Sequence, residues 1–90
     1  MGSAKEKELL KAVIHVTLKP GVLDPQGRAV FQALQHLGFS EVEDVRVGKR
    51  IVVSLNRKGG GPTRERLEEM CRSLLANPVI EEFQVEMGEE

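Results

Sequence analysis

Strand-like and helix-like patterns alternate along this 90-residue chain, and their order restricts the fold more than any other feature. Residues 12–19 place aliphatic side chains on one face at the two-residue period of a strand. Two later stretches carry apolar side chains three or four positions apart, as an amphipathic helix does, at residues 25–37 and 63–75. The strand period returns in residues 42–47, 51–55 and 79–87. The order predicted by these patterns is βαββαβ.

The predicted helices have recognisable ends. Asp24 offers an N-cap oxygen, and the proline that follows it suits the first helical position, so the first helix is predicted from Pro25 to Leu37. Gly38 suits the left-handed conformation that closes a helix. Thr63 is the predicted cap of the second helix, and Asn77-Pro78 is its predicted stop. The second helix has the most regular apolar spacing in the chain, through Leu67, Met70, Cys71, Leu74 and Leu75.

The two middle strands are predicted to form a hairpin joined through Gly48-Lys49-Arg50. Val45 and Val47 should share a face with Ile51 and Val53. A two-residue loop at Gly48-Lys49 does not give that register, so the hairpin needs an odd loop or a bulge.

The βαββαβ order predicts an α+β fold with a mainly antiparallel sheet and two helices on one face, as in ferredoxin-like domains. We expect residues 1–11 to form a flexible N-terminal segment and residues 12–90 to form a single domain. The other face of the sheet is predicted to hold Val13, Val52 and Ile80. Because so small a chain has a limited core with which to cover a second face, we expect it to oligomerise.

Composition excludes several classes of function. The chain has 13 basic and 14 acidic residues, and its net charge of -1 gives no general field for nucleic acid or a membrane surface. Aromatic residues make up 3%, all phenylalanine, which leaves little for stacking bases. No apolar run approaches the roughly 20 residues that span a bilayer. The single cysteine, Cys71, forms no internal disulfide, which fits a cytoplasmic protein.

No set of residues with catalytic or metal-binding spacing is found. The two histidines, His15 and His36, lie far apart in the sequence, and neither is predicted to be a ligand or a catalyst. Cys71 lies within the apolar stripe of the second helix and is predicted to belong to the core. The Gly59-Gly60-Gly61 run follows its lysine instead of preceding it and so does not match a phosphate-binding P-loop. We therefore predict no catalytic, cofactor-binding or metal-binding residue.

Charge is unevenly distributed along the chain. Five basic residues occur between Arg46 and Lys58 without an acid, and five acids occur between Glu81 and Glu90 without a base. Two solvated surfaces explain this arrangement, and so do complementary patches that orient neighbouring subunits.

Three segments carry a recognisable pattern: VTLKPGVLDPQG at residues 16–27, VRVGK at residues 45–49 and MCRSLLANPVIE at residues 70–81. They resemble the PurS family, the small subunits of phosphoribosylformylglycinamidine synthase. Residues 16–27 are similar to the opening signature of that family. Residues 45–49 resemble its hairpin, and residues 70–81 resemble its second helix and the turn that follows. The chain departs from the family pattern at Val52 and in the Gly59–Pro62 loop, where many relatives are acidic.

The resemblance implies a non-catalytic role in purine biosynthesis. In that enzyme a glutaminase subunit, PurQ, releases ammonia, and a synthetase subunit, PurL, uses ATP and Mg²⁺ to aminate the substrate. The resemblance implies that this chain does not itself bind ATP, Mg²⁺ or glutamine. It implies instead that the chain joins PurL to PurQ, and that it does so as a homodimer or a dimer of dimers. A free-standing ACT-like regulatory module that binds a small ligand is the alternative, because it shares the βαββαβ order.

If the chain is a PurS-like joining subunit, its contacts with the partners are predicted in the rigid loops and turns. Helix capping already explains Asp24 and Asn77, together with the prolines that follow them, so these residues have structural roles as well. Lys19 and Lys49 have no such explanation and are the stronger binding candidates. The predicted contact residues are Lys19, Pro20, Gly21, Asp24, Pro25, Gly48, Lys49, Asn77 and Pro78.

Overall fold

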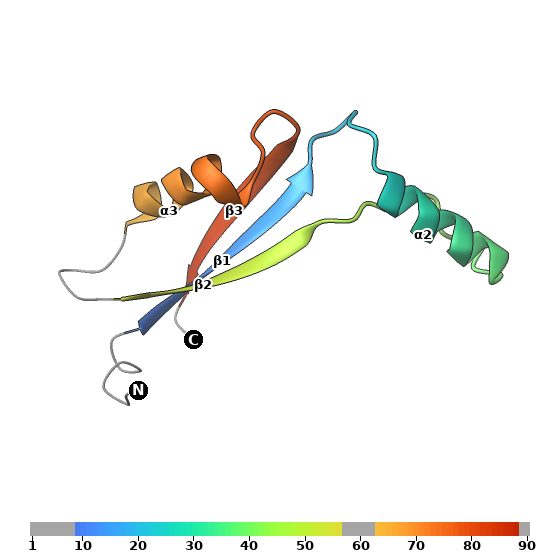
Figure 1. The fold of residues 1–90 in the computed structure, drawn as a ribbon. Coiled ribbons are helices and arrows are strands. Elements are labelled where there is room, and N and C mark those ends of the chain that lie inside the picture. The colour runs from blue at the N-terminus through green and yellow to red at the C-terminus, as the bar shows by residue number, and fades with distance from the viewer. Residues whose placement is uncertain (1–8, 57–62, 89–90) are drawn as a thin grey trace.

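The computed structural model describes residues 9–56 and 63–88. Its elements in chain order are β1 (Leu9–Leu18), α2 (Pro25–His36), β2 (Lys49–Asn56), α3 (Arg64–Met70), the π-helical turn η2 (Cys71–Leu75) and β3 (Glu81–Gly88). The strands form an antiparallel sheet in the order β2-β1-β3 (Figure 1). The α+β class and the mainly antiparallel sheet are confirmed.

The N-terminal strand is longer than its pattern predicts. β1 begins at Leu9, so residues 9–11, expected in the flexible segment, pair with β2 instead. Residues 1–8 and the predicted Gly59–Gly61 loop lie outside the described residues.

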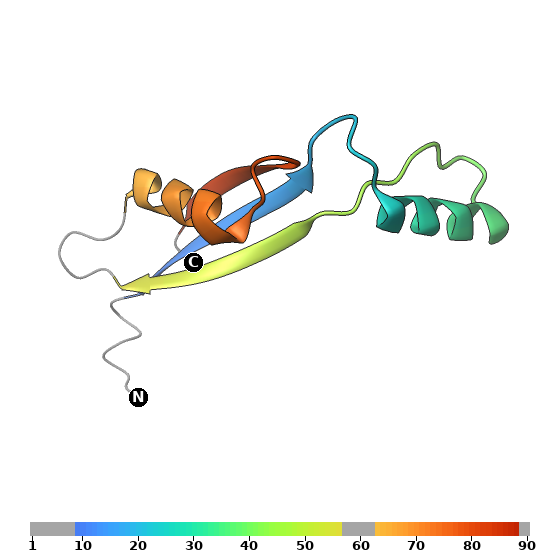
Figure 2. The same cartoon turned by 45° about the horizontal axis from the view of Figure 1, so that its top comes forward.

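The core lies between the sheet and α3. Ala12, Ile14 and Val16 alternate along β1 and are buried, as the two-residue period predicts. The helix formed by α3 and η2 lies over this part of the sheet (Figure 2). From it, Leu67 and Cys71 join the same core cluster and are fully buried. Burial raises the pKa of the Cys71 thiol, and the nearby Glu68 carboxylate raises it further. Cys71 is therefore a core residue, as predicted.

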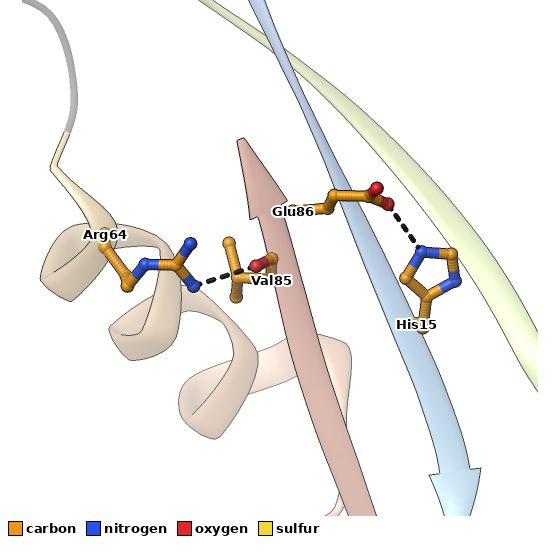
Figure 3. Close-up of polar contacts among 4 residues, drawn as sticks. All are labelled: His15, Arg64, Val85 and Glu86. Carbon is orange, nitrogen blue, oxygen red and sulfur yellow. Dashed lines mark hydrogen bonds and ion pairs between the residues drawn. The ribbon is translucent and has the colours of Figure 1, made fainter. Parts of the chain in front are cut away.

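Arg64 ties the start of α3 to the edge of the sheet. Its guanidinium Nη1 donates a 2.8 Å hydrogen bond to the Val85 carbonyl oxygen of β3 (Figure 3). Thr63 caps the same helix, because its side-chain oxygen accepts from the Arg66 N–H at 3.1 Å. The predicted start of this helix is confirmed.

The end of the second helix differs from the predicted stripe. The Ala76 N–H donates to the Cys71 carbonyl at 2.9 Å, an i to i+5 bond that widens the last turn. A wider turn rotates the following side chains away from the 3.6-residue period. Leu74, predicted to face the core, is consequently 83% exposed, whereas Leu75 packs against the core.

The predicted hairpin through Gly48-Lys49-Arg50 does not form. Residues 42–48 contain no assigned strand, and β2 starts at Lys49. The chain instead runs back along α2, where the Gln35 side chain donates to the Val42 carbonyl at 2.7 Å and the Val47 N–H donates to the Asp24 carboxylate at 2.9 Å. Alternating valines predict an extended chain, but the choice of partner depends on these tertiary contacts.

The first helix has its predicted length but not its predicted position. α2 ends at His36, and Gly38 follows with a φ of 98°, in the left-handed region. Instead of covering the sheet beside α3, α2 lies beyond one end of it (Figures 1 and 2). No helix within residues 9–56 and 63–88 is long and apolar enough to cross a membrane.

The second face of the sheet is only partly as predicted. Val13 and Val52 are directly paired across β1 and β2 on that face, where Val52 is 46% exposed. Ile80 lies instead in the turn before β3, because that strand begins at Glu81.

Candidate partner interface at the loop end of the sheet

The predicted contact residues lie together at one end of the sheet. β1 ends at Leu18, and its antiparallel partners β2 and β3 begin at Lys49 and Glu81. The loop after β1, the segment before β2 and the turn before β3 therefore meet at what we call the loop end, residues 19–26, 47–49 and 77–81 (Figure 1). Sheet topology thus brings together residues that are far apart in the sequence.

The loop after β1 begins with a tight turn. The Val22 N–H donates to the Lys19 carbonyl at 3.1 Å, with Pro20 and Gly21 between them. Gly21 has a φ of 88°, as the third residue of a type II turn requires. Pro20 occupies the second position, which proline favours in this turn. The Lys19 N–H donates to the Ile80 carbonyl at 2.8 Å and so joins this loop to the turn before β3.

Arg46 holds the loop after β1 through two hydrogen bonds from its guanidinium. Its Nη1 donates to the Val22 carbonyl and its Nη2 to the Lys19 carbonyl, both at 3.2 Å. A guanidinium presents several donors in a fixed plane, which suits two neighbouring carbonyls. No sequence pattern predicts this role, because Arg46 is more than 20 positions away from the residues that it contacts.

Asp24 connects the loop, α2 and the chain before β2. Its carboxylate accepts the Gly27 N–H and the Val47 N–H, each at 2.9 Å, and the residue is 7% exposed. These two donors, Gly27 first, hold the pKa of Asp24 below its usual value, and Arg46 lowers it further against the opposing effect of burial. The predicted cap is confirmed, and Pro25 occupies the first helical turn.

The pH dependence of stability should reflect the titration of the Asp24 carboxylate. Because folding lowers the Asp24 pKa, its stabilising contribution is full above the unfolded value of about 4 and is lost as pH falls through the folded value. We expect Asp24→Asn to lower the thermal midpoint at pH 7 and to flatten its decline below about pH 4. Exposed Asp44 provides the control through Asp44→Asn, and parallel losses in the two variants would contradict this role.

Two glycines allow the close approach of backbone segments. A Cβ on Gly27 would overlap the Val45 carbonyl oxygen, so this helix position requires glycine. A Cβ on Gly48 would lie 2.6 Å from the Val16 carbonyl oxygen. Gly48 therefore packs against the end of β1 and is not a hairpin tip.

The turn before β3 is held by Asn77. Its carbonyl accepts the Ile80 and Glu81 N–H groups at 3.1 and 2.7 Å, and its Oδ1 accepts the Val79 N–H at 3.1 Å. The Asn77 N–H in turn donates to the Glu81 carboxylate at 2.7 Å. Asn77 thus has a structural role in the turn before β3 and not as the predicted cap of the second helix, whose C-cap is Ala76.

Lys49 is the first residue of β2 and lies across the loop end from β3. Its Nζ lies 3.9 Å from the Glu81 carboxylate, and its side chain is 56% exposed. An ion pair this long and exposed adds little stability. Lys49 therefore remains accessible to a partner.

A cavity of about 630 Å³ opens among these loops. Its lining includes Leu18, Leu23 and Ile80, with Lys49 and Glu81 on the charged side. The contact prediction omitted the apolar side chains. Leu23 is an apolar residue in a loop, and it belongs to the apolar pattern of no predicted strand or helix. An apolar side chain with no predicted place in the core is the sequence signal by which it could have been found.

The histidines lie elsewhere. His15 is on the second face of the sheet, where its Nε2 lies 3.0 Å from the Glu86 carboxylate (Figure 3). His36 is exposed in the last turn of α2. Within residues 9–56 and 63–88, no three His, Cys, Asp or Glu side chains are grouped to hold a metal ion.

Residues 11–89 match the family model described as PurS, phosphoribosylformylglycinamidine (FGAM) synthase. The chain belongs to the PurS family. It is 42% identical over 81 residues to the synthase subunit PurS of Bacillus subtilis, covering 90% of this chain and 95% of that relative. It is 39% identical over 79 residues to PurS of Methanocaldococcus jannaschii, covering 88% and 95%.

Solved PurS structures share the fold as well. A crystal form of Bacillus subtilis PurS matches with a TM-score of 0.80 at 42% identity, covering 89% of this chain and 99% of that one. A chain in the structure of PurLQS from Thermotoga maritima matches with a TM-score of 0.73 at 28% identity, covering 89% and 98%. The family match over residues 11–89 spans the whole loop end described above.

Proposed function

We propose that this chain is the small, non-catalytic subunit of a phosphoribosylformylglycinamidine synthase that joins a PurL synthetase subunit to a PurQ glutaminase subunit. The observation that carries the proposal is the PurS family match over residues 11–89. The structural match to a chain of PurLQS supports the assignment of partners. The ACT-like alternative is not favoured, because the curated relatives at 31–47% identity bear the PurS name.

In this assembly, the whole complex is a ligase that forms a C–N bond with glutamine as amide donor. ATP, Mg²⁺ and glutamine are bound by the larger subunits, and ammonia passes between them without entering bulk water. This chain supplies a binding surface for the two larger subunits and no catalytic group. The clamped backbone of the loop end supports that role, because an ordered surface loses less conformational entropy when a partner binds.

The proposed location is the cytoplasm. Cys71 is a free thiol buried in the core, and it is compatible with a reducing compartment.

A second copy of the chain completes the apolar packing that one copy leaves open. α2 lies beyond one end of its own sheet (Figure 1). Its apolar stripe comprises Val30, Ala33, Leu34 and the following Leu37, and Leu37 is 72% exposed. A groove of about 410 Å³ beside α3 is lined largely by apolar side chains that include Val53, Met70 and Leu75. Because α2 lies beyond its own sheet, we propose that it packs into this groove on a second copy, as a homodimer or within a dimer of dimers.

Reconstitution tests the subunit role. The purified chain, mixed with PurL and PurQ in the presence of glutamine and Mg-ADP, should elute with both in one peak from a sizing column. Absence of co-elution would count against the proposal. A thermal shift of the chain with an amino acid alone would instead favour the ACT-like module.

The lysines of the loop end should contribute to assembly. We expect Lys19→Glu and Lys49→Glu each to slow association with the partner subunits about tenfold at low salt, with the difference shrinking as ionic strength rises. Lys11→Glu, an exposed lysine in β1 far from the loop end, is the matched control. Association rates measured by biosensor decide the outcome, and equal rates for folded Lys19→Glu and Lys11→Glu would refute this contact.

A further inference from the structure

One edge of the sheet and one segment of the chain each lack the strand partner that the sequence pattern predicts for them. β2 pairs with β1 alone within the part of the chain that the structure describes, and an edge strand presents a row of backbone groups to a further strand. Residues 42–47 have the alternating valines of a strand, yet among residues 9–56 and 63–88 no acceptor is found for the N–H groups of residues 43–46.

The β1–β2 ladder prevents these two parts of one chain from pairing. Lys49 and Arg50, which belong to the predicted turn, are already paired with β1. Gly48 approaches the Val16 carbonyl oxygen so closely that a Cβ would lie 2.6 Å from it. The chain therefore enters β2 along β1 without reversing, and a hairpin would have to break these contacts.

Residues 42–47 and α2 form one arm. The Gln35 side chain of α2 donates to the Val42 carbonyl at 2.7 Å, and the carboxylate of the N-cap, Asp24, accepts the Val47 N–H at 2.9 Å. The groove proposed above to receive α2 of a second copy is lined in part by Val53 of β2. An α2 helix placed in that groove brings its attached segment to the β2 strand of the same copy.

We propose that two copies of the chain exchange these arms, so that residues 42–47 of each pair antiparallel with β2 of the other. The strand contact that the sequence predicts within one chain is then made between two chains. This inference rests on the proposed function, and it deepens the homodimer there by adding a strand pairing and a symmetry to the packing of α2.

The apolar face and the charges together indicate one register. Val45 lies opposite Val53 of the second copy, and Val47 lies opposite Ile51, so the apolar side chains share a face. Both pairs are symmetric about Lys49, and the two-fold axis of the dimer therefore passes between the two Lys49 residues.

Like charges that are directly opposed are unfavourable, but at Lys49 an acid is close by. Its Nζ lies 3.9 Å from the Glu81 carboxylate of its own chain, which offsets the repulsion. A shift of the register by two residues would place Arg50 opposite Arg50 in one direction and Val47 opposite Lys49 in the other.

Paired cysteines test the exchange in the full-length chain. Directly opposed residues of an antiparallel pair have Cα atoms about 4.5–5.5 Å apart, within the reach of a disulfide. Val45→Cys/Val53→Cys, oxidised above the concentration of dimerisation, should give at least about tenfold more covalent dimer on a non-reducing gel than either single variant. All these variants retain Cys71, which is buried and does not compete.

Lys49→Cys tests the symmetry at an exposed position where the fold tolerates change. It should crosslink to its own copy, because the two-fold axis passes there. Arg50→Cys is the matched control, since it is exposed and next in the strand, but its two cysteines would be diagonal neighbours about 7–8 Å apart. We expect at least about tenfold less covalent dimer from this control.

Three results would overturn the inference. If the double-cysteine variant forms its disulfide within one chain, seen as a monomer of faster mobility, residues 42–47 pair with their own β2. If sedimentation shows a homodimer but both cysteine tests stay at the level of their controls, α2 joins the copies without an exchange of strands. If the unmodified chain is monomeric at every concentration yet elutes with PurL and PurQ, the exchange and the homodimer fail while the joining role stands.

Discussion

Leu67→Ala should lower the free energy of unfolding by about 2–5 kcal/mol, the range for truncating a fully buried leucine. Leu67 has no solvent exposure and packs from α3 onto the buried side chains of β1. In so small a core the surroundings have few residues with which to refill the cavity. Urea unfolding at a fixed protein concentration gives the value, because association contributes to apparent stability.

Leu74→Ala is the matched control for that loss. Both leucines belong to the apolar stripe predicted from the sequence, yet Leu74 is 83% exposed beyond the widened turn of η2. Because Leu74 also lines the groove beside α3, we expect its replacement to change stability by no more than about 0.5 kcal/mol in the monomer, at a protein concentration below that of dimerisation. Equal losses for the two variants would contradict the arrangement of the π-helical turn.

Val30→Asp should weaken the proposed homodimer at least about 100-fold. Val30 lies on the apolar stripe of α2 and is 41% exposed in one copy. An aspartate there is accessible to water in the monomer but loses its hydration when α2 enters the groove, where the one cation of the lining, Arg66, already lies 3.4 Å from the Glu69 carboxylate. Burying the carboxylate there costs about 3–5 kcal/mol. The folded monomer should be little affected, and sedimentation equilibrium measures the dissociation constant.

Gln32→Asp places the same charge on the same helix outside the stripe and should leave the dissociation constant within about threefold. If both variants dissociate alike, α2 does not pack through its apolar stripe. If both remain monomeric at every concentration, as does the unmodified chain, the homodimer itself is refuted.

Much of the local structure could be predicted from the sequence. The caps at Asp24 and Thr63 and the glycine at position 38 were identified correctly, because each depends on hydrogen bonds or dihedral angles within a few residues. The buried face of β1 was also predicted, since the two-residue period alone separates its two faces. The nine predicted contact residues lie at one end of the sheet, and their binding role stays a prediction.

The main error is the predicted strand at residues 42–47, which does not form. The Val42 carbonyl, the Val47 N–H and the Arg46 side chain are instead engaged by Gln35, by Asp24 and by the loop after β1. The second helix begins at its predicted cap but ends in a wider turn that exposes Leu74. Neither outcome is encoded in the periodicity of the segment itself.

The sequence by itself determined where the two helices start, the inward faces of β1 and α3, and membership of the PurS family. Only the tertiary structure decided that α2 leaves its own sheet, that Arg46 and Asp24 clamp the loop end, and that Leu23 joins Ile80 at one cavity. The physical reason is the distance along the chain over which each kind of interaction acts. Periodicity and capping act within one or two turns of chain, whereas these contacts join residues that only folding brings together.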